Sequence, residues 1–230
     1  MNIFTPRKQI KLIILGDENV GKTTIISKYT NFDYLNTINF EFSSKIIQNS
    51  DYEIKVNIWD VKGHIAFNKM CNSYIKDSNA FVIVYDITNP KTFYNIPFWI
   101  NKIKENNQHV FNNNYYPILL IGNKYDNENR KIYYEEAKKF ALYNELLYCE
   151  LSKDNIDKIN SVLDIYLNFV YDIDNIKENQ DFNYQNIFFL QCEKKENKLP
   201  LTKSIENLNL LNNQYKNKSC KNCQNICEIL

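Results

Sequence analysis

The glycines of this chain stand where a phosphate-binding backbone would need them. Only 4 of the 230 residues are glycine, whereas average usage would give roughly 16. Two of them bracket the run GDENVGKT at residues 16–23, and the other two belong to short polar motifs, DVKG at 60–63 and GNKYD at 122–126. Glycine lets a backbone approach a phosphate or adopt positive φ without steric cost. The distribution therefore indicates a phosphate site.

Residues 16–23 fit the phosphate-binding pattern G-x-x-x-x-G-K-[ST], between an apolar strand and a helix, which is the context that gives this pattern its meaning. Backbone N–H groups and the helix dipole would hold the α- and β-phosphates. Lys22 would reach the β- and γ-phosphates, and Thr23 would ligate Mg²⁺. We expect the nucleotide-binding residues of this segment to be Asn19, Val20, Gly21, Lys22, Thr23 and Thr24.

A second motif, DVKG at residues 60–63, follows a predicted strand that ends at Trp59. The Asp60 carboxylate would reach the Mg²⁺ shell, and the Gly63 N–H would bond a γ-phosphate. Alone, D-x-x-G is a weak signal. At the end of a strand that follows a phosphate-binding loop, it is a strong one.

The motif NKYD at residues 123–126 indicates which base is bound. The Asp126 carboxylate can accept hydrogen bonds from N1–H and the 2-amino group of guanine, whereas adenine presents an acceptor at N1 and would leave the carboxylate unpaired. The Lys124 stem would lie along the base, and Asn123 would tie this loop to the phosphate loop. The sequence therefore predicts a guanine site.

Alternating apolar patterns supply the elements that would position these motifs. Strands are predicted at residues 10–15, 40–47, 53–59, 80–85, 117–121 and 146–151, and helices at 22–29, 66–76, 92–106, 133–143 and 156–170. This alternation implies an α/β fold, a mostly parallel sheet covered by helices on both faces, to which the hairpin at 40–59 adds an antiparallel edge. Pro97 would kink its helix or delay its start.

Composition sets the boundaries of the domain and narrows the function. We expect a domain at residues 1–172, followed by an Asn- and Lys-rich flexible tail at 173–230. The net charge of +1 gives no field that would favour nucleic acid. No apolar run approaches the ~20 residues of a membrane span, and the N-terminus lacks a signal-peptide core. The 6 cysteines form no secreted disulfide framework, which favours a reducing compartment.

With TINFEF at residues 37–42, WDVKGH at 59–64 and YDIT at 85–88, these motifs resemble the Ras superfamily of small GTPases, most closely the Rab family, over residues 8–172. The resemblance implies a P-loop GTPase fold with a six-stranded sheet and five helices, which binds GTP or GDP with Mg²⁺. It makes Thr37 the threonine of the first switch, so that the metal ligands would be Thr23, Thr37 and Asp60. It also implies switch loops that GTP orders and hydrolysis releases.

Rab-like function carries further expectations. The resemblance implies a GTP/GDP switch in vesicle-mediated membrane traffic. Its partners would be an exchange factor, an activating protein, effectors and prenyl-binding escort proteins, and no nucleic acid. The chain would be found in the cytosol and on the cytoplasmic face of an internal membrane.

Departures from the family pattern predict slow hydrolysis. His64 stands where the family has the glutamine that positions the attacking water, which makes it the candidate catalytic residue. Glu18 replaces a small residue. Its carboxylate at ~4 Å from a γ-phosphate would cost about 4 kcal/mol at an effective dielectric of ~20, and much less if the side chain turned to solvent.

Two further departures from the family pattern concern the residues that would contact the base. The spacing from Lys22 to Thr37 is shorter than is usual in the Rab family, so either Phe32 or Tyr34 would stack on the base. The third base-contacting motif is SKD, with Ser152 followed by Lys153, whose backbone N–H would bond guanine O6. These departures leave open a pseudo-GTPase that acts as a protein-interaction module, and, less favoured by the NKYD motif, another P-loop phosphotransferase.

The C-terminal residues CEIL fit C-a-a-X with a terminal leucine, which favours geranylgeranylation of Cys227. One lipid alone gives marginal, reversible membrane binding, so a second signal is expected. Cys220 and Cys223 could be acylated, and neighbouring lysines could add a weak basic anchor. A zinc site is the poorer interpretation of these cysteines, because no fourth ligand lies nearby in the sequence.

Overall fold

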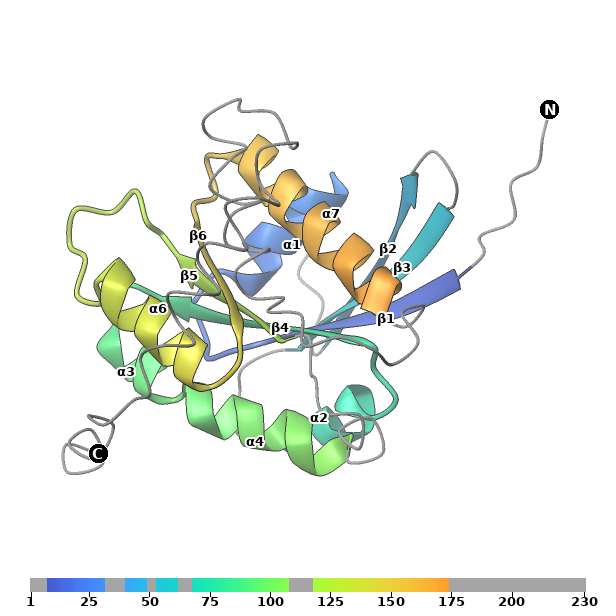
Figure 1. The fold of residues 1–230 in the computed structure, drawn as a ribbon, viewed down its shortest axis with the longest axis horizontal. Helices are drawn as coiled ribbons and strands as arrows, with labels where there is room; N and C mark the ends of the chain where they lie inside the picture. The colour runs from blue at the N-terminus through green and yellow to red at the C-terminus, as the bar shows by residue number, and fades with distance from the viewer. Residues whose placement is uncertain (1–7, 32–39, 49–52, 62–67, 108–117, 174–230) are drawn as a thin grey trace, which may run out of the picture. The chain divides into compact units, whose positions relative to one another are not determined.

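A six-stranded sheet forms the centre of the fold in the computed structural model, which describes residues 8–31, 40–48, 53–61, 68–107 and 118–173 (Figure 1). The strand order is β2-β3-β1-β4-β5-β6. The strands are β1 (Lys8–Leu15), β2 (Phe40–Gln48), β3 (Glu53–Val61), β4 (Ala80–Asp86), β5 (Ile118–Asn123) and β6 (Leu147–Leu151). The chain divides into two compact units, Met1–Cys192 and Glu193–Leu230, and every described residue lies in the first.

Strand pairing confirms the predicted mostly parallel sheet. β1 pairs parallel with β3 and β4, and β5 pairs parallel with β4 and β6. β2 pairs antiparallel with β3, which is the predicted hairpin edge. Because the carboxyl ends of the parallel strands meet at one edge of the sheet, the motifs that follow β1, β3, β4, β5 and β6 are brought together there.

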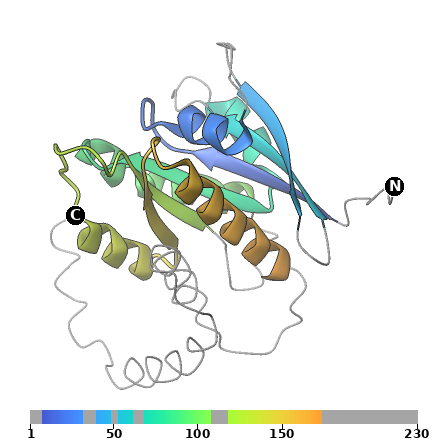
Figure 2. The ribbon, with the colours of Figure 1, turned by 90° about the horizontal axis from the view of Figure 1, so that it is seen from above.

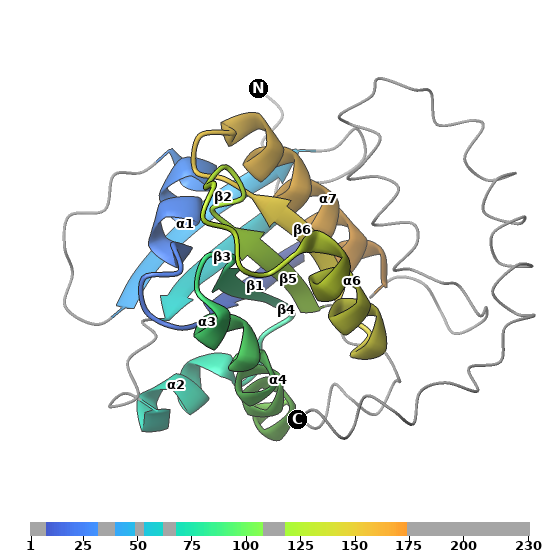
Figure 3. The same cartoon turned by 90° about the vertical axis from the view of Figure 1, so that its left-hand side faces the viewer.

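Helices cover both faces of the sheet, as Figures 1, 2 and 3 show. α1 and α7 lie on one face, and α2, α3, α4 and α6 lie on the other. Their bounds are α1 (Lys22–Thr30), α2 (Asn68–Ile75), α3 (Pro90–Tyr94), α4 (Ile96–Asn106), α6 (Tyr134–Tyr143) and α7 (Ile156–Ile173). Within the described residues, none of these helices is both long and apolar enough to cross a bilayer.

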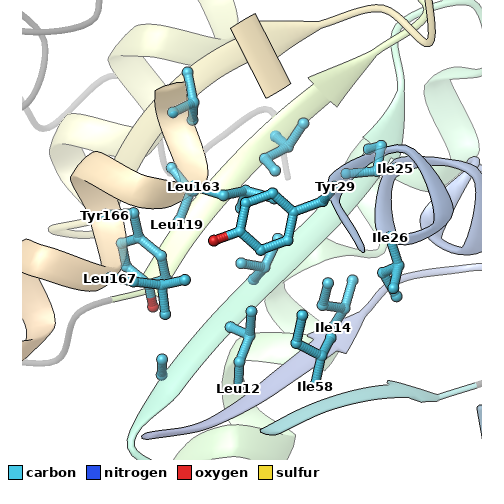
Figure 4. Close-up of a cluster of buried hydrophobic side chains, with 14 of the residues drawn as sticks. Leu12, Ile14, Ile25, Ile26, Tyr29, Ile58, Leu119, Leu163, Tyr166 and Leu167 are labelled. Atoms are coloured by element: carbon cyan, nitrogen blue, oxygen red, sulfur yellow. The ribbon is translucent and has the colours of Figure 1, made fainter. Parts of the chain in front are cut away.

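Alternate residues of β1 feed two separate cores. Leu12 and Ile14 pack beneath α1 and α7 (Figure 4), whereas Ile13 and Leu15 pack against the helices of the other face. All four are buried to within 1%, and each such side chain contributes roughly 1.5–3 kcal/mol relative to exposure. Burial on both faces makes the second half of β1, residues 12–15, a continuous apolar run, which is why the sequence identified this strand.

Two side chains of α1 and α7 combine apolar packing with hydrogen bonds. The Tyr166 hydroxyl accepts from the Phe81 amide at 2.8 Å and donates to the Phe81 carbonyl at 2.9 Å, which fixes α7 on the start of β4. The Tyr29 hydroxyl donates to Asp164 at 2.8 Å. The Lys45 ammonium lies 3.6 Å from the centroid of the Tyr29 ring, so β2, α1 and α7 are held at one corner of the fold.

The predicted helix at residues 92–106 is wrong in one respect: the segment is two helices, with Asn95 between them. Pro97 lies in the first turn of α4, where its lack of an N–H costs nothing. In a continuous helix the same proline would remove the bond to the Phe93 carbonyl. The described residues therefore contain six helices rather than the five that the family resemblance implies.

Candidate functional site

The phosphate loop, residues 16–23, has a backbone that only glycine fits at two positions. Gly16 has φ +137 and Gly21 has φ +95. A Cβ at Gly16 would lie 2.2 Å from the Val84 carbonyl oxygen, and one at Gly21 would lie 2.3 Å from the Asn123 side-chain nitrogen. The prediction that glycine survives where the backbone requires it is confirmed at both positions.

Lys22 is curled back into the phosphate loop. Its ammonium donates to the carbonyl oxygens of Gly16 at 2.9 Å and Asp17 at 2.7 Å, and only 6% of the residue is exposed. Gly21 caps α1 without a side chain, so no side chain of the cap competes for the first N–H groups of the helix. A helix N-terminus beside a lysine in this arrangement suits an anion.

The first turn of α1 meets the end of β3. The Thr23 hydroxyl donates to the Asp60 carboxylate, and Asp60 is only 2% exposed. A hydroxyl and a carboxylate side by side are oxygen ligands of the kind that Mg²⁺ prefers in phosphate sites. Two of the three predicted metal ligands are therefore adjacent. The third, Thr37, lies outside the described residues.

The base loop, residues 123–126, is tied directly to the phosphate loop. The Asn123 amide donates to the Val20 carbonyl at 2.8 Å, which is the link that the sequence predicted. The Lys124 ammonium donates to the Asn19 carbonyl at 3.0 Å. Asn19 and Lys124 both have positive φ, 61 and 68, a conformation uncommon for residues other than glycine that Asn31, Asp77 and Glu145 adopt elsewhere in the fold.

The loop after β6 lies against the base loop. The Tyr125 amide donates to the Leu151 carbonyl at 3.3 Å. Ser152 is 2% exposed, and its hydroxyl accepts from the Asp154 amide at 3.3 Å. Asp126 and Lys153 are exposed. The structure thus gathers residues from three separate motifs at one edge of the sheet.

Comparison with known proteins agrees with this geometry. The sequence profile of the Ras family matches residues 11–172. This chain belongs to the Ras family. It is 31% identical over 166 residues to the Ras-related protein Rab-11B of Dictyostelium discoideum, an alignment that covers 70% of this chain and 73% of that protein. The chain is therefore a divergent, Rab-like small GTPase.

The base loop of this Rab-like chain rests on a partly buried polar network. Arg130 donates to both carboxylate oxygens of Glu150, at 2.8 and 2.7 Å. The Tyr148 hydroxyl donates to Glu150 at 2.9 Å and lies 3.0 Å from the Tyr85 hydroxyl. Burial raises the pKa of both phenols above its ordinary range, so both stay protonated. Gly122 leaves room for this network, because a Cβ there would lie 2.8 Å from the Tyr85 hydroxyl.

Lys124 has an ionic partner in the YDIT motif of the Rab-like pattern. Its ammonium lies 2.5 Å from an Asp86 carboxylate oxygen. The other Asp86 oxygen accepts from the Thr88 amide at 2.9 Å and from the Thr88 hydroxyl at 2.7 Å. Asp86 is thereby oriented toward the base loop, a positioning role that the sequence analysis did not identify although it had singled out the motif.

A row of aromatic side chains lies on the helix α2 side of the hairpin edge; we call it the aromatic row. Phe42 and Trp59 have ring centroids 5.0 Å apart, and those of Trp59 and Tyr74 are 5.3 Å apart. Phe42 is 55% exposed. Sequence reasoning missed this surface. The signal was an aromatic residue at an outward position of a predicted edge strand.

Several predicted residues of this GTPase are not placed. Thr37, Gly63, His64 and Cys227 lie outside the described residues, as do Phe32 and Tyr34, so their roles stay predictions. Glu18 is described and is exposed. Water can therefore screen part of the repulsion between its carboxylate and a bound phosphate.

Proposed function

We propose that this Rab-like chain is a GTP/GDP switch that regulates vesicle-mediated membrane traffic, hydrolyses GTP slowly on its own, and reaches its membrane through a lipid on Cys227. The observation that carries the nucleotide part is the hydrogen bond from Asn123 to the Val20 carbonyl. It makes one continuous site of a loop suited to phosphate and a loop suited to guanine.

Each predicted residue has a role in this proposed site. Lys22 and the N-terminus of α1 would hold the phosphates, with Asn19, Val20, Gly21 and Thr24 supplying loop backbone and Gly63 a further N–H. Asp126, Ser152 and Lys153 would read the guanine. Thr23, Thr37 and Asp60 would hold Mg²⁺, which when bound neutralises charge on the β- and γ-phosphate oxygens.

Slow hydrolysis follows from two side chains at the phosphate end. His64 lacks the amide that orients water in related GTPases. Glu18 occupies space where an activating protein would insert an arginine finger, an element worth roughly 10³–10⁵ in rate. Both therefore act on the same step, one on the intrinsic reaction and one on its stimulation.

The switch is better supported than the alternative of a pseudo-GTPase that serves only as an interaction module. A module without nucleotide would have no need of a buried lysine on the phosphate-loop carbonyls. Nor would it need the Thr23–Asp60 pair at the end of β3.

Native mass spectrometry of the purified protein tests nucleotide identity. We expect bound GDP or GTP. Asp126→Asn should shift preference toward xanthine nucleotides, because the amide reverses one donor–acceptor match with the base. Asp154→Asn is the matched control: it makes the same change on an exposed side chain of the neighbouring loop and should keep guanine preference. ATP binding that competes equally with GTP in the wild type would overturn the proposal.

The membrane part of the proposal has a separate test. Cys227→Ser should move the protein from the membrane fraction to the cytosol and remove a geranylgeranyl mass from the C-terminal peptide. Cys192→Ser is the control, since that cysteine lies outside the C-a-a-X motif. An unchanged membrane fraction, together with no prenyl mass on the wild type, would contradict lipid attachment.

The aromatic row is the surface that we assign to effectors. It lies on the hairpin edge, β2–β3, directly after the predicted first switch in the sequence. A 55% exposed Phe42 supplies the large rigid apolar contact that interface hot spots favour. Exchange factors, activating proteins and escort proteins are further partners expected of a Rab-like switch.

A further inference from the structure

The second residue of the phosphate loop, Asp17, turns its carboxylate toward helix α4. One carboxylate oxygen accepts two hydrogen bonds, from the Asn95 amide at 2.7 Å and from the Trp99 indole N–H at 2.8 Å. Trp99 is only 5% exposed, and a buried indole N–H needs an acceptor. Asp17 supplies that acceptor from the loop itself.

The Asn95 side chain bonds to Asp17 and does not cap its own helix. It is the N-cap of α4, a position where asparagine normally accepts a hydrogen bond from its own helix, yet its side chain makes no capping bond. The side chain reaches the phosphate loop instead. Asn95 lies at the break between α3 and α4. The break therefore positions the side chain that binds the phosphate loop.

The backbone and the side chain of Asp17 accept hydrogen bonds from different donors. Its carbonyl oxygen accepts from the Lys22 ammonium at 2.7 Å, on the side where the proposed phosphates bind. Its carboxylate faces the helix donors. The loop carries a second acidic residue, Glu18, next to it. A carboxylate that turned toward the phosphates would repel them, and at short range such repulsion amounts to several kcal/mol.

We propose that Asn95 and Trp99 are positioning residues for nucleotide binding, which hold the Asp17 carboxylate on the α4 side of the phosphate loop and away from the phosphates. This inference rests on the proposed nucleotide-binding function. It goes beyond that function by assigning a role to three side chains that are not expected to touch the nucleotide.

The role predicts an effect that depends on phosphate charge. Trp99→Phe keeps the ring and removes the donor, and Asn95→Ala removes the other donor. Each variant removes one of the two hydrogen bonds that hold the Asp17 carboxylate. We expect affinity for a non-hydrolysable GTP analogue to fall about 10-fold or more and affinity for GDP to fall less, because GDP carries less charge. Raising the salt concentration should narrow this difference, because ions screen the repulsion.

A double-mutant cycle isolates the charge. Asp17→Asn keeps an oxygen that can accept both bonds but carries no charge. In that background Trp99→Phe should change neither affinity by more than about twofold, so most of the loss seen in the wild-type background should disappear as coupling between the two positions. Tyr94→Phe is the matched control, because it removes a hydroxyl from the 62% exposed Tyr94 of α3.

Titration calorimetry of the full chain with GDP and the GTP analogue, in Mg²⁺ at two salt concentrations, decides the matter. A greater loss for the analogue that disappears in the Asp17→Asn background supports the positioning role. Equal losses for both nucleotides, or the same loss in the Asp17→Asn background, would mean that Trp99 acts only through folding and would overturn it. A wild type that binds neither nucleotide would overturn the proposed function as well, which distinguishes the two failures.

Discussion

The two ends of the nucleotide site are built differently. At the base end, the lysine and the arginine are paired with carboxylates, Lys124 with Asp86 at 2.5 Å and Arg130 with Glu150 at 2.7 Å. At the phosphate end, the two oxygens that accept from Lys22 in the loop are neutral carbonyls of Gly16 and Asp17. The base end thus uses its charges to fix the shape of its loop, whereas the phosphate end holds the Lys22 ammonium on the backbone of the phosphate loop.

This difference assigns separate duties to the two ends. A base is recognised by the geometry of donors and acceptors, which needs rigid loops. Phosphates are recognised largely by charge, which needs cations and N–H groups in reach. Changes at the base end should alter affinity for GDP and GTP alike. Changes at the phosphate end should separate the two nucleotides or alter turnover.

The largest effect is expected where the two ends join. Gly21→Ala would place a Cβ 2.3 Å from the Asn123 side-chain nitrogen, at a φ of +95. Steric conflict and backbone strain together should weaken GDP and GTP binding by at least about 100-fold, measured by titration calorimetry. Gly122→Ala is the comparison at the base end, because its Cβ meets the Tyr85 hydroxyl and should lower the melting temperature more than it lowers affinity per folded molecule.

If Gly21→Ala bound nucleotide as tightly as the wild type, the link between Asn123 and Val20 would not matter. The phosphate loop and the base loop would then act independently in nucleotide binding.

Turnover should respond only to the phosphate end. In single-turnover assays, His64→Gln and Glu18→Gly should each speed GTP hydrolysis, and the double variant should be fastest, about tenfold or more above the wild type. Glu18→Gly should also favour GTP over GDP, because it removes negative charge near the loop. A wild type at about 10⁻⁴ s⁻¹ or above, with no gain in the double variant, would show that both residues are harmless.

Asp86→Asn probes the base end with a smaller effect. The asparagine oxygen can still accept from Thr88, but the ionic partner of Lys124 is lost. Affinities for GDP and GTP should fall together by about fivefold, close to 1 kcal/mol. A clearly larger loss for GTP than for GDP would place Lys124 in contact with charge and would erase the proposed distinction between the ends.

Much of the fold could be predicted because its signals are local. Ile54, Val56 and Ile58 alternate with less buried residues along β3, and this periodicity alone identifies a strand. The site motifs follow buried strands, so their meeting at one edge follows from a parallel sheet. Pro97 did predict a kink or a delayed start. The separate helix α3 before the break at Asn95 could not be predicted, because a proline in the first turn of a second helix resembles a proline inside one long helix.

The side-chain hydrogen-bond networks could not be predicted from the sequence for a different reason. Asp17 meets its partners across 78 and 82 positions of the chain, and no periodicity relates such residues. Tyr85 and Tyr148 looked like ordinary members of apolar strands, and only their pairing in the sheet reveals the shared hydroxyl contact. The aromatic row was missed likewise, because exposure of Phe42 depends on which face of β2 is covered.

The network beneath the base loop should contribute stability with a defined pH dependence. Tyr148→Phe removes the hydroxyl between Tyr85 and Glu150 and should lower the unfolding free energy by about 1–3 kcal/mol, measured in urea. Burial raises the pKa of both phenols in the folded protein, whereas in the unfolded chain it stays at about 10. Their contribution to stability is therefore complete below pH ~10 and is lost progressively as the pH rises above that value. Between about pH 9 and pH 11, one unit on either side of the unfolded pKa, the variant should lose less stability than the wild type.

The smallest effect on stability is expected at the aromatic row. Phe42→Ala removes a side chain that is already 55% exposed, so the unfolding free energy should fall by less than about 1 kcal/mol, with both nucleotide affinities unchanged. Effector capture by the GTP-loaded protein should nevertheless be lost. Ile46→Ala, on the same strand and 54% exposed, is the control. A large loss of GDP or GTP affinity in Phe42→Ala would mean that the nucleotide site also depends on the aromatic row.

Tryptophan placement gives this protein two built-in optical reporters. The chain has 2 tryptophans. Trp99 is buried and bonded to the phosphate loop, whereas Trp59 is partly exposed within the aromatic row. Their indoles therefore sense different events, one at the nucleotide and one at the docking surface. In a Trp59→Phe protein, the tryptophan fluorescence, excited where tyrosine does not absorb, would come from Trp99 beside the phosphate loop, without any attached dye.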